Sequence, residues 1–179
     1  MSETPLSIIQ FWRDEIGAAH WFDNDPRLDA RIRARFEALW QSARAGAFDA
    51  WLATPEGALA LVIVLDQFPR NMFRGHADAF STDPNARVAA NRAIDSAFDW
   101  RVPTVLRVFF YLPFMHSEDM ADQDRSVALI EERLGKDSSN YPYALGHREQ
   151  IARFGRFPGR NEALGRHTTP QETVFLNPG

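Results

Sequence analysis

The sequence contains no cysteine among its 179 residues, and Lys136 is its only lysine. The absence of cysteine excludes disulfide bonds, thiolate nucleophiles and metal sites with cysteine ligands. Positive charge comes almost entirely from 19 arginines, whose planar guanidinium groups can bind carboxylates and phosphates through two hydrogen bonds at once. A GC-rich genome would produce the same bias, so composition alone does not give the arginines a function.

Long hydrophobic runs are also missing. The longest covers residues 58–65, far short of the ~20 residues that cross a bilayer. The first residues lack the basic and apolar regions of a signal peptide. We therefore expect a cytoplasmic protein that does not contact a membrane. The net charge of −4 argues against a nucleic-acid partner.

Apolar and aromatic residues are plentiful. Hydrophobic residues make up 45% of the chain and aromatic residues 12%, including 14 Phe and 5 Trp. This content is typical of a folded globular protein, and the length fits one domain with a sizeable core. We predict a single domain over residues 1–179 with a core rich in aromatic rings.

A two-residue pattern, Thr or Asp followed by Pro, recurs along the chain. The Thr or Asp side chain accepts hydrogen bonds from the first amides of a helix. Pro at the first helical position loses no hydrogen bond, because an N–H there has no partner within the helix. Thr169 also precedes Glu172 by three residues, which is the spacing of a capping box. Each pair therefore predicts a helix start: Thr4-Pro5, Asp25-Pro26, Thr54-Pro55, Asp83-Pro84 and Thr169-Pro170.

Apolar residues follow these pairs at helical spacing. Residues 26–43 present one apolar face, whereas 58–65 are apolar throughout; a buried strand would look similar, but the cap at Thr54 favours a buried helix. Further helices are expected over 104–112, ending near Pro113, over 118–134 and over 142–155. No strand or hairpin pattern is present. We predict an all-α fold of about eight helices that pack as antiparallel pairs.

The first candidate cluster begins where the apolar segment 58–65 ends. Asp66 continues the apolar face of this segment and therefore needs a cationic partner, which Arg70, Arg74 or Arg107 could supply. A structural ion pair that holds a helix end would explain these residues. Alternatively, Arg70, Asn71 and Arg74 line a ligand-binding groove.

The second cluster follows Tyr111. Ser117 can cap the next helix, and Glu118 and Asp119 would be favourable beside its positive N-terminal end. Capping accounts for these three residues but leaves His116 unexplained. The residue types of a hydrolase triad are present, but the Gly-x-Ser-x-Gly turn that exposes a nucleophilic serine is absent.

The third cluster lies within residues 147–167, where five arginines face only two glutamates. Segment 118–137 is correspondingly acidic, so the two segments could simply attract each other. His147 fits a core histidine with a satisfied partner. Neither His-x-Glu pair can chelate from one helix, because residues two apart point in different directions. A metal site formed in three dimensions by His116, His147 and a carboxylate stays open, but we predict no cofactor.

At these clusters the chain resembles a bacterial family of uncharacterised proteins called domain of unknown function 924. The similarity extends over nearly the whole chain, and it implies a tetratricopeptide-like, right-handed stack of antiparallel helix pairs. It implies no activity. The matching residues are Asp66-Gln67-Phe68-Pro69-Arg70-Asn71, Arg74-Gly75, Phe110-Tyr111-Leu112-Pro113, Met115-His116-Ser117-Glu118-Asp119, His147, Arg153-Phe154-Gly155-Arg156-Phe157-Pro158, Arg160-Asn161 and Leu164-Gly165-Arg166.

Two classes of function follow from these residues. The first is a binding module whose arginine-lined groove holds a small anionic ligand or an acidic peptide. The second is an enzyme that uses His116 or His147 with Glu118 or Asp119 as an acid–base pair, with or without a metal. The clusters are expected to converge on one site, formed by Asp66, Arg70, Asn71, Arg74, Tyr111, His116, Glu118, Asp119, His147, Arg156, Arg160 and Asn161.

Overall fold

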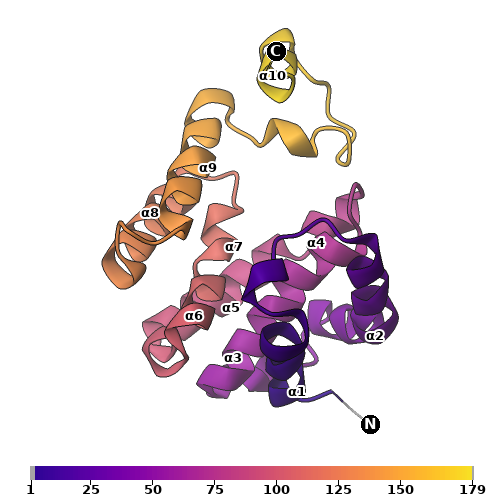
Figure 1. Ribbon diagram of the computed structural model, residues 1–179, viewed down its shortest axis with the longest axis vertical. Helices are drawn as coiled ribbons and strands as arrows, with labels where there is room; N and C mark the ends of the chain where they lie inside the picture. The colour runs from indigo at the N-terminus through magenta and orange to yellow at the C-terminus, as the bar shows by residue number, and fades with distance from the viewer. Residues whose placement is uncertain (1–2, 179) are drawn as a thin grey trace. The chain divides into compact units, whose positions relative to one another are not determined.

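A computed structural model describes residues 3–178, and helices are its only regular elements (Figure 1). No β-strand occurs in this range, which confirms the predicted all-α fold of about eight helices. Within the same range, no helix has the length and apolar character needed to cross a membrane. Contacts divide the chain into two compact units: unit 1 comprises residues 1–74 and 78–113, and unit 2 comprises residues 75–77 and 114–179. The single domain and the tetratricopeptide-like stack stay predictions.

Unit 1 is built from short and medium-length helices. Helix α1 packs against α3, α2 against α4, and α3 against α5. Two π-helical turns, η1 (Phe11–Ile16) and η4 (Ile63–Gln67), continue α1 and α3 without a break. The α-helices lying wholly within unit 1 are α1 (Pro5–Gln10), α2 (Pro26–Arg44), α3 (Pro55–Val62), α4 (Phe68–Met72), α5 (Asp83–Asp95) and α6 (Thr104–Arg107).

Aromatic rings form the centre of unit 1, as the composition predicted. Phe68 is fully buried, and its ring stacks on that of Phe36 with centroids 4.5 Å apart. The rings of Phe11 and Trp12 contact the same residue at 6.2 and 5.7 Å. Edge and stacked ring pairs of this kind add to the stabilisation that comes from apolar burial.

Four of the five predicted helix starts are confirmed. Thr4, Asp25, Thr54 and Thr169 are N-caps whose side chains accept amide hydrogen bonds, and Thr169 forms the predicted capping box with Glu172. The prediction for Asp83 is wrong. The N-cap of α5 is Thr82, one residue earlier, and the Asp83 carboxylate pairs with an arginine instead.

Thr82 does not cap with its side chain because the hydroxyl has other partners. It donates to the backbone carbonyl of Leu65 in the π-helical turn η4, at 2.6 Å, and accepts from the indole N–H of Trp40 at 3.1 Å. Thr82 is fully buried. These bonds tie α2, η4 and α5 together at one end of unit 1.

The helix predicted over 104–112 is interrupted, and the expectation that it ends near Pro113 is wrong. The chain forms α6, then the 3₁₀ turn η7 (Val108–Phe110), and then starts α7 (Leu112–Met115) just before the proline. Pro113 lies in the first turn of α7, where its missing N–H costs no intrahelical hydrogen bond.

Unit 2 contains a helical hairpin and a C-terminal segment. Helix α8 (Met120–Leu134) and α9 (Asn140–Phe154) lie side by side and are joined by a short connection (Figure 1). After α9 come the 3₁₀ turn η8 (Pro158–Arg160) and helix α10 (Pro170–Leu176). Ser117 is not the cap of α8, contrary to prediction. Asp119 has that role and accepts from the amides of Ala121 and Asp122.

Candidate functional site

The predicted site residues of unit 1 gather around Arg70 on α4. Its guanidinium donates to both carboxylate oxygens of Asp83 at 2.8 and 3.0 Å, and to the backbone carbonyl of Asp66 at 2.6 Å. The Asp66 carboxylate lies 3.3 Å from the same group. Burial alone would lower the pKa of Arg70, but Asp66 and Asp83 together raise it. Arg70 is thus the cation that buried Asp66 requires, and it links α4 to α5.

Asn71 and Arg74 share a second carboxylate, that of Asp29 on α2. Arg74 donates to both oxygens at 2.8 and 3.0 Å, and the Asn71 amide donates at 2.9 Å. These hydrogen bonds raise the pKa of Arg74. The pattern did not identify Asp29, because it lies 45 residues from Arg74 in the sequence and reads as an ordinary polar residue of an amphipathic helix.

Tyr111 belongs to the interior of unit 1. Its side chain is fully buried, and its hydroxyl donates to the buried carboxylate of Asp99 at 2.8 Å. Asp99 was not among the predicted residues, since nothing in the local sequence distinguishes it from an exposed turn residue.

In unit 2, Glu118 is held from two sides. Arg166 donates to both of its oxygens at 2.8 Å, and the backbone N–H of Phe157 donates to one of them at 2.9 Å. Burial raises the pKa of Glu118, but the hydrogen bonds from Arg166 and Phe157 outweigh this effect, and the net shift is downward. Glu118 therefore joins the segment before α8 to the turn that follows α9.

Beside Glu118 lies a group of four side chains, here called the His116 cluster: His116, His147, Phe157 and Arg160. The two imidazole centroids are 6.4 Å apart, and the His147 ring meets the Phe157 ring edge-on at 5.3 Å. The Arg160 guanidinium stacks 4.6 Å from the Phe157 centroid and donates to the His116 carbonyl at 2.7 Å. The second and third sequence clusters thus converge within unit 2.

Arg156 and Asn161 bind a carboxylate of their own, Glu172 on α10. Arg156 donates to both oxygens at 2.7 and 2.9 Å, and the Asn161 amide donates at 3.3 Å. The hydrogen bond from Arg156 is the main reason that the pKa of Glu172 falls to about 2, and the Thr169 N–H adds to the effect. Sequence reasoning found Glu172 only as the second half of a capping box.

We expect the Glu172 ion pair to make unit 2 acid-sensitive. Because the pKa of Glu172 falls from 4.5 to about 2 on folding, its contribution is complete above pH 4.5 and is lost as the pH falls toward 2. Glu172→Gln should therefore lower the melting temperature at pH 7, and the difference from wild type should shrink between pH 4.5 and 2. Thermal unfolding followed by circular dichroism measures this, with the exposed Glu162→Gln as control. A difference that does not vary with pH would contradict it.

The predicted site residues are divided between the two units. In unit 2, the His116 ring lies beside that of His147, Arg160 donates to the His116 carbonyl, and Asp119 caps α8. The prediction that Asp66, Arg70, Asn71 and Arg74 of unit 1 join them stays a prediction. Among residues 3–178, no three His, Asp or Glu side chains are placed to hold a metal ion. The predicted site left out the partners that these residues bind, Asp29, Asp83, Asp99, Arg166 and Glu172, of which Arg166 was noted only as one of the five arginines of the third cluster.

Comparison with known proteins identifies the family. A model of the family described as bacterial protein of unknown function (DUF924) matches residues 8–179, and the chain belongs to this family. The solved structure of ATU0120, a protein of unknown function from Agrobacterium tumefaciens, is 44% identical and has a TM-score of 0.92, covering 98% of this chain and 97% of that one. The comparison with curated proteins gave no match. These relatives give the family and the fold but no activity.

Proposed function

We propose that the protein binds a small oxyanion at the His116 cluster. The observation that carries the proposal is the grouping of charged side chains in unit 2. One carboxylate, Glu118, interacts with two guanidinium groups. Arg166 pairs with it directly, and the charge of Arg160 also lowers the pKa of Glu118. Two histidines lie beside these groups. The cluster therefore gathers two guanidinium groups and two imidazoles around one carboxylate, a set of donors that suits an anion.

Two carboxylates of unit 2 already have partners of their own. Glu172 is in a two-bond ion pair with Arg156, so its charge is already compensated. The negative charge of Asp119 is stabilised by the first amides of α8. Neither of these carboxylates therefore depends on the His116 cluster for its compensating charge.

The cluster is accessible and held in place. His116, His147 and Arg160 are each half-buried, so a solute can reach them while part of their hydration is already lost. Stacking on Phe157 and the bond to the His116 carbonyl restrict the Arg160 side chain. A restricted guanidinium loses less conformational entropy when it binds a ligand. The compactness of the cluster favours a small anion over an extended acidic peptide.

The orientation of His147 adds a donor. Its Nδ1 lies 2.8 Å from the backbone carbonyl of Tyr143, and a carbonyl can only accept, so Nδ1 carries a hydrogen. When the imidazole is protonated, Nε2 also carries a hydrogen that can be donated to an anion.

Sulfate is the probe that tests this proposal, because it is a small oxyanion that is fully ionised at neutral pH. We expect sulfate to bind wild-type protein in isothermal titration calorimetry, and Arg160→Gln to weaken binding about tenfold or more. A charge-assisted hydrogen bond contributes roughly 1.5–3 kcal/mol, and 1.4 kcal/mol corresponds to a factor of ten.

The matched control is Arg153→Gln, which removes the same charge from unit 2. Arg153 is exposed and stacks on Phe154 and Phe175, neither of which belongs to the cluster. This variant should change the sulfate affinity less than twofold. Equal losses in the two variants, or no binding of sulfate at millimolar concentration, would overturn the proposal.

Acid–base catalysis by His116 and His147 is the second candidate. The supporting observation is the fixed tautomer of His147, whose Nε2 is the basic atom of the neutral ring, within a pair of imidazoles 6.4 Å apart. Glu118 and Asp119 are engaged with Arg166 and α8, so the histidines themselves would transfer the proton. A panel of phosphate and carboxylate esters tests it: hydrolysis should disappear in both His116→Ala and His147→Ala.

A further inference from the structure

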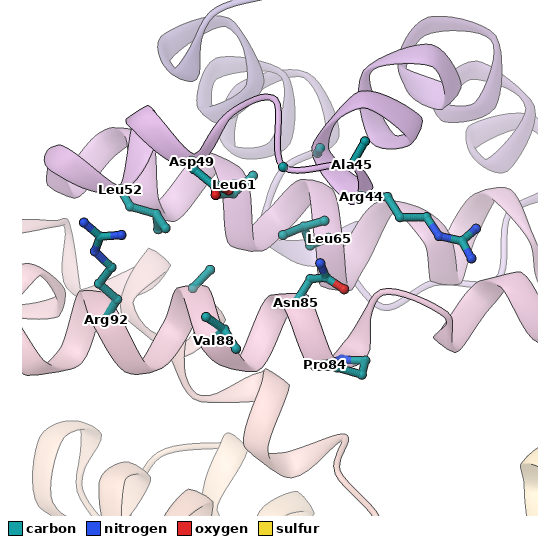
Figure 2. A pocket seen from close by; sticks show the side chains of 13 residues that line it. Arg44, Ala45, Asp49, Leu52, Leu61, Leu65, Pro84, Asn85, Val88 and Arg92 are labelled. Atoms are coloured by element: carbon teal, nitrogen blue, oxygen red, sulfur yellow. The ribbon is translucent and has the colours of Figure 1, made fainter.

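A cavity of about 440 Å³ lies within unit 1. None of the four residues of the His116 cluster lines it. Figure 2 shows that α5 forms one side of this cavity, with the side chains of Asn85, Val88 and Arg92, and that Leu52, Leu61 and Leu65 face it. Cavities that hold small molecules are commonly in this range of volume and combine an apolar lining with a few polar groups.

On the α5 side of the cavity, an apolar side chain lies between two polar ones. Asn85, Val88 and Arg92 are separated by three and four residues, so they lie on one face of the helix. Seven residues extend over two turns, which places the two polar side chains about 10 Å apart along the helix axis. Val88 between them is 65% exposed, which is unusual for an apolar side chain next to a cavity and leaves its surface free to contact a ligand.

The opposite side supplies apolar surface. Leu52 comes from the 3₁₀ turn η3 (Asp49–Ala53), Leu61 from α3 and Leu65 from the π-helical turn η4. All three are at least 93% buried in the protein as a whole, so they contribute only a thin strip of surface to the cavity. π-Helical turns are often found at functional sites. The hydroxyl of Thr82 fixes this one, through the Leu65 carbonyl.

Charge in the cavity is carried by two arginines and one aspartate. Arg44 is occupied, since it lies 3.9 Å from Asp78 and stacks on Trp40. The exposed side chains of Asn85 and Arg92, by contrast, make no hydrogen bond, ion pair or ring contact with any residue in the range 3–178. Asp49 belongs to η3, on the side of the cavity across from α5 (Figure 2). The Arg92 guanidinium, at one end of the apolar lining, complements a ligand that has one carboxylate at the end of an apolar chain.

We propose that unit 1 contains a second binding site, for an elongated amphipathic carboxylate. Its carboxylate pairs with Arg92, and its apolar body lies between Val88 and the strip formed by Leu52, Leu61 and Leu65. The site is separate from the oxyanion site and does not depend on it. A compact inorganic anion would leave the apolar strip uncovered, so the two sites differ in the ligands that they select.

Octanoate is the probe, with octylamine as its analogue of opposite charge. Isothermal titration calorimetry should show saturable binding of one octanoate per chain and none of octylamine. Arg92→Gln should weaken octanoate binding about tenfold or more, because it removes a charge-assisted pair. Val88→Ser, at an exposed position where folding is not at risk, should weaken it about threefold or more through loss of apolar contact.

Two controls separate this site from general effects. Arg101→Gln removes an exposed arginine of the same unit that does not line the cavity, and it should leave octanoate binding within twofold of wild type. Arg160→Gln should also leave it unchanged, so a failure of the oxyanion proposal would not affect this result. Equal binding of octanoate and octylamine, non-saturable binding, or equal effects of Arg92→Gln and Arg101→Gln would overturn the proposal.

Discussion

Arg70→Met is expected to lower the free energy of unfolding by about 3–5 kcal/mol, the loss typical when one partner of a buried ion pair is removed. The Arg70 side chain is only 19% exposed, and the Asp66 and Asp83 side chains are 1% and 8% exposed. Without the guanidinium, these two carboxylates lose their principal compensating charge. Urea unfolding followed by tryptophan fluorescence measures the effect specifically, because all five tryptophans belong to unit 1.

Arg74→Met is the matched control for this prediction. Arg74 also forms a two-bond pair with a carboxylate, but its side chain is 42% exposed, and solvent-exposed pairs contribute about 1 kcal/mol or less. A second test combines Arg70→Met with Asp83→Leu, which should recover part of the lost stability. If Arg70→Met costs less than 1 kcal/mol, Arg70 is not a structural cation, and the groove interpretation of the first cluster regains its basis.

The second large effect is expected at the centre of the aromatic core. Phe68→Ala should destabilise unit 1 by about 3–5 kcal/mol, because it removes a fully buried ring and leaves a cavity among Phe11, Trp12 and Phe36. Phe22→Ala is the control, since Phe22 is 64% exposed and its removal should change stability by about 0.5 kcal/mol or less. Similar losses in the two variants would show that burial in the ring cluster does not decide stability.

Much of the fold could be predicted because its signals are local. A Thr or Asp before a proline marks a helix start through hydrogen bonds that close within one turn, and four of the five starts are confirmed. Asp83 shows where this reasoning ends. Its sequence context is the same as that of Asp25, but the buried guanidinium of Arg70, 13 residues earlier, binds its carboxylate and the helix begins at a different residue. A pattern of neighbouring residues cannot predict that Arg70 binds the Asp83 carboxylate in place of the helix amides.

The candidate site was predictable in its residues but not in its pairings. His116, Glu118, His147, Arg156 and Arg160 were identified as chemically notable, and unit 2 does bring the second and third clusters together. Glu118 was interpreted as a helix-terminal carboxylate, whereas Arg166, 48 residues later, binds it. The cavity of unit 1 produced no sequence signal at all, because Asn85, Val88 and Arg92 look like the solvent face of an ordinary helix.

The most direct test of the oxyanion proposal is a sulfate titration at pH 6 followed by nuclear magnetic resonance. The quantity recorded is the chemical shift of each histidine ring signal. The chain has five histidines, of which His116 and His147 belong to the proposed site, whereas His20 lies in unit 1 beside Asp23. The proposal predicts saturable shifts of the His116 and His147 ring signals, with one common affinity, and no shift for His20. Unchanged His116 and His147 signals, or equal drifts of all five histidines, would contradict it.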